Sequence, residues 1–298
     1  MKQVIWKNKK WVGYVLYCIL LTFALLYYRF PADAFKDYIQ ATAQRINPDL
    51  LIRFESLSPY YPFGLKCTEA ELALRGNPEK TIFLTETLYF RPKVLTLLKR
   101  DPVYCFETLA YGGNIKGRVH LIKEGLETSY ETSVALNDIS IDNNSDIPVI
   151  IGKHVKGVLN GTLTYNGKNK SLIDGTGEAI LSLADGRIKI SLPLLSLKAI
   201  DFKEVLLKMA FKNQRLKLSH AELKGENMMG MASGTIDMKK ELPLSRLDLR
   251  VTIEPYADLI KNLPNGQDTM RSLKQHLKDG KFSFHIQGTI KDPKFRLI

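Results

Sequence analysis

The chain has 298 residues and a formal net charge of +12, with 45% hydrophobic and 25% charged residues. These values are typical of a folded protein, so they exclude a largely disordered chain and a polytopic membrane protein. Five basic residues lie among the first 29 positions, which contain no acidic residue. The rest of the positive excess is spread along the chain without a long basic run, so we expect no nucleic-acid partner.

Residues 11–28 form an uncharged segment of 18 residues, preceded by four lysines and followed by Arg29. As a helix it would be about 27 Å long, close to the hydrocarbon thickness of a bilayer. We therefore predict a cytoplasmic basic tail at 1–10, a single transmembrane helix at 11–28, and the rest of the chain across the membrane. The predicted anchor residues are Trp11, Tyr14, Leu16, Leu20, Phe23, Leu26 and Tyr28.

A cleaved signal peptide is the alternative, because Ala32-Asp33-Ala34 has the small-x-small form of a cleavage site. The segment 29–48 then predicts an amphipathic juxtamembrane helix. Its apolar residues Phe35, Tyr38 and Ile39 fall at helical spacing, and it ends near Pro48.

From residue 49 to 298 the apolar period changes from helical to alternating, most strictly at 247–253, 282–286 and 188–192. Turn signals such as Asn166-Gly167 and Asp185-Gly186 separate the alternating runs. We predict a mainly β domain of roughly a dozen antiparallel strands. Short helices are expected at 92–100, 201–212 and 267–278.

Each predicted strand has one apolar face, and such a face must be buried against another layer of the protein or a ligand. An elongated, curved antiparallel sheet with an open apolar groove and a closed β-sandwich both satisfy the pattern, as does a sealed core at the same positions. The candidate groove residues are Leu247, Leu249, Val251, Ile253, Phe282, Phe284 and Ile286.

The sequence offers little for catalysis. It lacks GxSxG, P-loop, GxGxxG and HExxH motifs, and its five histidines are scattered. We expect no enzyme activity, cofactor or bound metal. Of the three cysteines, Cys67 and Cys105 could form a disulfide in an oxidising compartment.

Three segments carry a family resemblance. They are LLIRFESLSPYYPFGLKCTEAEL at 50–72, YFRPKVLTLLKRDPVYCFETLAYGGNIKGRV at 89–119, and DGKFSFHIQGTIKDPKFRLI at 279–298. With the lysine-flanked anchor, they resemble protein N of the type II (general) secretion pathway, in its longer AsmA-like form.

The resemblance implies a single-pass inner-membrane protein with a periplasmic β-rich domain. It also implies a non-enzymatic structural role beside other type II secretion subunits. AsmA-like proteins have a curved sheet with a hydrophobic groove. The alternative that the resemblance implies is therefore a phospholipid-binding or lipid-transfer module.

Overall fold

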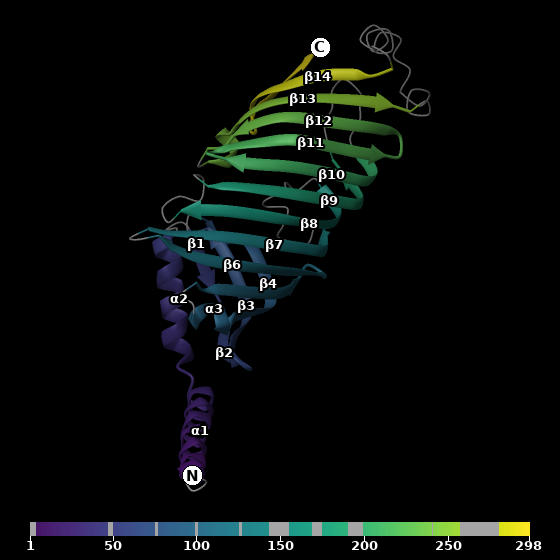
Figure 1. The fold of residues 1–298 in the computed structure, drawn as a ribbon. Coiled ribbons are helices and arrows are strands. Elements are labelled where there is room, and N and C mark those ends of the chain that lie inside the picture. The colour runs from purple at the N-terminus through teal and green to yellow at the C-terminus, as the bar shows by residue number, and fades with distance from the viewer. Residues whose placement is uncertain are drawn as a thin grey trace.

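The computed structural model describes residues 4–46, 50–74, 77–98, 101–124, 127–142, 155–168, 175–189, 199–239, 241–256 and 280–298. They form two N-terminal helices followed by one long antiparallel sheet (Figure 1). The mainly β prediction with few short helices is therefore confirmed.

The helices α1 (Val4–Tyr28) and α2 (Ala32–Ile46) are separated by three residues. Their break falls at Pro31, which cannot donate a backbone hydrogen bond to the preceding turn. Within the described residues, no helix is both long and apolar enough to cross a membrane. A third helix, α3 (Val94–Leu98), lies inside the predicted segment 92–100.

Within the described residues the sheet contains fifteen strands. They are β1 (Leu50–Arg53), β2 (Ser56–Tyr60), β3 (Gly64–Leu74), β4 (Asn77–Pro92), β5 (Val103–Ala110), β6 (Gly113–Glu124), β7 (Glu127–Ile141), β8 (Val155–Lys168), β9 (Thr176–Ile188), β10 (Ile200–Lys212), β11 (Arg215–Gly225), β12 (Met228–Asp237), β13 (Arg246–Pro255), β14 (Phe282–Thr289) and β15 (Pro293–Leu297). A 3₁₀ turn, η1 (Leu242–Leu244), precedes β13.

From β3 to β15 every strand pairs with the next strand along the chain, and both β1 and β2 pair with β3. The result is an elongated, curved sheet with open edges (Figure 1). Among the described elements no second sheet packs on the first, and the main helix contact is α2 against β1 and β2. The sandwich alternative is therefore wrong.

The predicted helix at 201–212 is also wrong, because this segment is strand β10. Phe202 and Val205 are both buried in one apolar cluster although they are three residues apart. A register shift between Phe202 and Glu204 marks a β-bulge, and a bulge restores the face of a strand after an odd spacing. The bulge therefore produces the helix-like period.

Two predicted turns lie inside strands. Asn166-Gly167 belongs to β8, and Asp185-Gly186 belongs to β9, where Asp185 has a φ of 47°. Left-handed residues occur at bulges as well as at hairpin turns, so the dipeptide signal does not separate the two. The predicted strand at 188–192 begins at the end of β9, and 190–192 lie outside the described residues, as does the predicted helix 267–278.

Candidate functional site: the apolar face of the sheet

One face of the sheet is apolar along its whole length, as the cross-strand register shows. In antiparallel sheets directly paired residues point to the same face. Starting at Leu65 in β3, each partner in turn is an apolar residue or glycine as far as Phe295 in β15. The row consists of Leu65, Phe90, Phe106, Gly117, Val134, Leu163, Ala179, Met209, Leu218, Gly234, Leu249, Ile286 and Phe295.

A second row, from Leu57 to Leu297, lies beside it and is apolar except for Thr108. Neighbouring strands lie about 4.8 Å apart, so each row is on the order of 55–60 Å long. We call the surface made by these rows the apolar face. An acyl chain spans about 15 Å, half the hydrocarbon core of a bilayer, so the face is several chains long.

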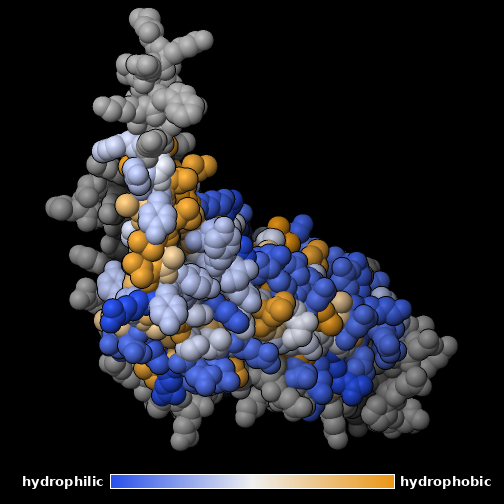
Figure 2. All heavy atoms as spheres, turned by 90° about the horizontal axis from the view of Figure 1, so that it is seen from below, coloured by the Kyte–Doolittle hydropathy of each residue, from blue (hydrophilic) through white to orange (hydrophobic). Residues whose placement is uncertain are grey.

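The adjacent row on the other side of the sheet is mainly polar. It passes from Lys66 through Glu107, Lys116 and Thr162 to Lys208. Figure 2, which views the molecule from below, shows hydrophilic side chains over much of the described surface and hydrophobic ones gathered along the helices. The sheet is thus amphipathic.

The C-terminal end of the apolar face combines a buried cluster with a cavity. Ile200, Met228, Ile253, Phe282 and Phe284 form a buried cluster there. Beside it a shallow cavity of about 360 Å³ is lined almost wholly by apolar side chains of β10 to β15. This is the composition expected of a site for an apolar ligand.

The predicted groove residues lie together on this face. Val251, Ile253, Phe284 and Ile286 line the cavity, and Phe282 belongs to the buried cluster. Leu247 and Leu249 continue the same face of β13 and are half-buried.

Towards the middle of the sheet the apolar side chains of the two rows are half-buried, whereas Leu183, Phe202 and Val205 beside them are buried in one cluster. In β9, exposed and half-buried residues alternate from Thr176 to Leu181. Ile180 points to the polar side and is 51% exposed, whereas Leu181 belongs to the apolar face.

Aromatic side chains cover glycines on the floor of the apolar face. The ring of Phe106 lies over Gly117, its partner across β5 and β6, where an added Cβ would come within 2.2 Å of the ring. Phe202 covers Gly186 in the same way. These glycines let the rings lie flat against the sheet.

The helix α2 covers the first end of the apolar face. Phe30, Ala32 and Ile39 pack against a buried cluster that includes Leu57 and Cys67. Gln40 Nε2 also donates a hydrogen bond of 3.2 Å to the Ile52 carbonyl. Of the predicted amphipathic stripe, Phe35 and Tyr38 are instead exposed, so α2 uses only part of it.

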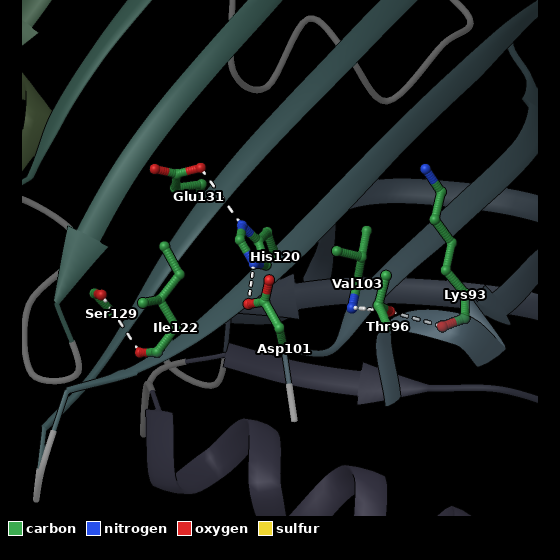
Figure 3. Close-up of polar contacts among 8 residues, drawn as sticks. All are labelled: Lys93, Thr96, Asp101, Val103, His120, Ile122, Ser129 and Glu131. Atoms are coloured by element: carbon green, nitrogen blue, oxygen red, sulfur yellow. Dashed lines mark hydrogen bonds and ion pairs between the residues drawn. The ribbon is translucent and has the colours of Figure 1, made fainter. Parts of the chain in front are cut away.

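A polar cluster holds the segment around α3 to the sheet (Figure 3). Its centre is His120 in β6, whose Nε2 contacts Asp101 and whose Nδ1 lies 3.6 Å from Glu131 Oε2. Thr96 accepts a hydrogen bond of 3.0 Å from the Val103 amide and donates one of 2.6 Å to the Lys93 carbonyl.

The hydrogen bond that His120 donates to the Asp101 carboxylate is the main cause that raises the pKa of His120, with Glu131 adding to it. The two carboxylates meet opposite nitrogens of the ring, so they do not converge on one point. In the described part of the chain, no group of His, Cys, Asp or Glu side chains is arranged to hold a metal ion. The cluster's chemistry is that of a structural ion pair.

The predicted disulfide is not formed, since Cys67 and Cys105 are free thiols. Strand β4 lies between their strands, which are therefore about 9.6 Å apart, too far for the bond. Cys67 lies in the second apolar row, whereas Cys105 pairs with Arg91 and Arg118 on the polar side. Burial raises the pKa of the Cys67 thiol to about 11.

The predicted anchor residues lie in α1. Trp11, Tyr14, Leu16, Leu20 and Tyr28 are between 59% and 91% exposed, and the side chains of Phe23 and Leu26 lie outside the described part. The sequence predicted an apolar face on each strand, but it placed candidate groove residues only in β13 and β14. The continuation of this face from strand to strand needs the register of all the intervening strands.

No family model, no curated protein and no solved structure matches this chain.

Proposed function

We propose that the protein is a membrane-anchored lipid-binding module that carries acyl chains along the apolar face. The observation that supports this most is the row from Leu65 to Phe295, which crosses thirteen strands without a charged or polar side chain. A chain that needed only a folded core would have no use for such a surface left half-covered.

The energetics favour binding that is reversible. Each fully buried methylene contributes about 0.8 kcal/mol, so ten would contribute on the order of 8 kcal/mol. An acyl chain on an open face buries only one of its sides, so it gains only part of this binding free energy. The chain can therefore slide along the face or dissociate. This is the behaviour required of a transfer surface rather than of a storage cavity.

The proposed anchor is α1, with its N-terminus in the cytoplasm and the sheet in the periplasm. The exposed apolar side chains of α1 and the uncharged run 11–28 support this, since neither suits a helix in water. The anchor would hold α2, and with it the first end of the apolar face, at the inner membrane.

A docking role among type II secretion subunits is the second candidate function, and the family resemblance suggests it. The feature that favours it is the free edge of β15, where Phe295 is 44% exposed. A partner strand could pair with this edge by β-augmentation. Co-purification of other secretion subunits with the full chain in mild detergent would test it.

The lipid proposal is tested by a matched pair of substitutions in β9. Leu181→Asp puts a charge in the middle of the apolar face, and Ile180→Asp puts the same charge on the opposite side. We expect full-length Leu181→Asp to lose most of the phospholipid that co-purifies with the wild type, while Ile180→Asp keeps it. Lipid is quantified after solvent extraction, and far-UV circular dichroism checks the fold. Equal lipid in both variants would contradict the proposal.

A further inference from the structure

The end of the sheet nearest α1 carries a small group of exposed apolar side chains. Tyr61 and Phe63, in the turn between β2 and β3, are 82% and 48% exposed, and Val94 and Leu95 of α3 are 39% and 76% exposed. Figure 1 places β2 and α3 at the end of the sheet from which α1 extends. We call these four residues the base.

The strand register brings the two parts of the base together. Leu65 pairs with Phe90, so Gly64, directly after the turn, lies opposite Arg91, shortly before α3. A Cβ on Gly64 would come within 2.9 Å of the Arg91 side chain, which confirms the proximity. The turn and α3 therefore project from the same end of adjacent strands.

The base also lies beside the junction between α1 and α2. Phe30 and Ala32, at that junction, pack against the cluster that contains Leu57, and Leu65 packs there too. Tyr28 and Ala32 are four positions apart in the sequence, and four residues extend at most about 14 Å. Tyr27 and Tyr28 end α1 as exposed aromatics, the residues favoured at a membrane–water interface.

Two exposed basic residues lie near the base, and one of them, Arg91, also lies 4.0 Å from the Glu107 carboxylate. Arg91 and Lys93 flank α3 on its N-terminal side and are exposed. The Arg91 guanidinium lies 5.0 Å above the ring of Tyr60. This contact places the charged group beside the turn. Basic residues at this level are attracted to anionic lipid headgroups.

Hydrogen bonds fix α3, which carries Val94 and Leu95 of the base, to the sheet. The Lys93 amide donates a hydrogen bond of 2.8 Å to the Val103 carbonyl, and Thr96 links α3 back to the same residue. The Asp101 amide donates a hydrogen bond of 3.1 Å to the Thr96 carbonyl, and Asp101 is itself held by His120 (Figure 3). A group of exposed apolar side chains on so fixed a support is typical of an interaction surface.

We propose that the base docks on the surface of the bilayer that holds α1, with Tyr61, Phe63, Val94 and Leu95 in the interface and Arg91 and Lys93 on anionic headgroups. This inference rests on the proposed anchor. It adds a second, peripheral membrane contact that orients the sheet relative to the bilayer and places the α2 end of the apolar face at the lipid surface.

Depth measurement by spin labelling tests the docking in the full chain, reconstituted in vesicles that contain anionic phospholipid. In a background with Cys18 and Cys105 replaced by serine, nitroxides are attached at Tyr61→Cys, Leu95→Cys and Leu20→Cys. Leu244→Cys, which is 50% exposed in η1 towards the other end of the sheet, is the control. Buried Cys67 stays in place.

We expect labels at 61, 95 and 20 to collide more with oxygen than with a water-soluble nickel chelate, and the label at 244 to show the reverse. If the label at 20 lies in the bilayer while those at 61 and 95 are aqueous, the docking inference fails and the anchor stands. An aqueous label at 20 would overturn the anchor and the docking together.

Charge reversal separates docking from general proximity. Lys93→Glu is expected to lower the membrane-bound fraction of the labels at 61 and 95 on the order of fivefold in anionic vesicles. The matched control Lys291→Glu, at an exposed position next to β15, should leave it unchanged. Equal effects of the two substitutions would overturn the headgroup contact.

Discussion

Ile180 and Leu181 are neighbours in β9, yet they face opposite sides of the sheet and have different surroundings. Ile180 lies between Thr162 and Lys208, whereas Leu181 lies between Gly161 and Leu207. The same alternation recurs in the other strands of the sheet. The function of a residue in a strand depends on whether its position is odd or even, because moving an apolar residue by one position moves it to the other face of the sheet.

The aromatic residues at the C-terminal end of the apolar face contribute unequally to stability. Phe282 is 7% exposed and Phe295 is 44% exposed. Phe282→Ala should lower the free energy of unfolding of the C-terminal strands by about 3–5 kcal/mol, because it leaves a cavity. Phe295→Ala should cost about 1 kcal/mol, since less apolar area is lost.

Amide hydrogen exchange of β13 and β14 in the full chain measures both costs, because exchange reports local opening in a long sheet. Similar costs for the two substitutions would mean that the cluster around Phe282 is not the stabilising core of this end.

The strands show how far the sequence allows prediction. The alternation in β13 and β14 was enough to predict both strands and the face they share, because neither strand contains a bulge in its mutual pairing. The spacing of Phe202 and Val205 in β10 led to a wrong helix, because a bulge mimics the helical period over such a short range. Bulges depend on the partner strand, and no local pattern contains that partner.

The polar cluster was missed for a related reason. His120 and Asp101 are 19 residues apart in sequence, and they meet only because β5 and β6 form a hairpin beside α3. An isolated histidine in a strand carries no signal of such a partner. His220 in β11 and His285 in β14 also lie within strands, and Glu222 and Asp248 lie beside them.

The attachment of α3 should depend on pH through His120. Its pKa is raised in the folded chain by Asp101, so the ion pair stabilises fully below the unfolded pKa of about 6.5. The stabilisation is lost as the pH rises through the raised folded value. We therefore expect the amides of Asp101 and Val103 to exchange faster at alkaline than at acidic pH, after correction for intrinsic rates.

His120→Gln is the control for this pH dependence. It keeps a hydrogen-bonding side chain but cannot acquire a charge, so the corrected exchange of both amides should become independent of pH. A dependence that survived in His120→Gln would assign the effect to another group.

The whole molecule is one amphipathic sheet rather than a closed domain. Antiparallel pairing extends it strand by strand, and among the described strands the two ends of the sheet remain open edges. Right-handed twist accumulates over many strands and produces the curvature seen in Figure 1. Such a sheet lengthens its apolar face with every added hairpin, while α2 covers only the first end.

The central claim is that this long apolar face binds lipid. Native mass spectrometry of the full-length protein, released from mild detergent and followed by lipid extraction, tests it most directly. We expect stoichiometric phospholipid that survives extensive washing. A homogeneous, folded and lipid-free protein would contradict it and would leave docking to other proteins as the role of the sheet.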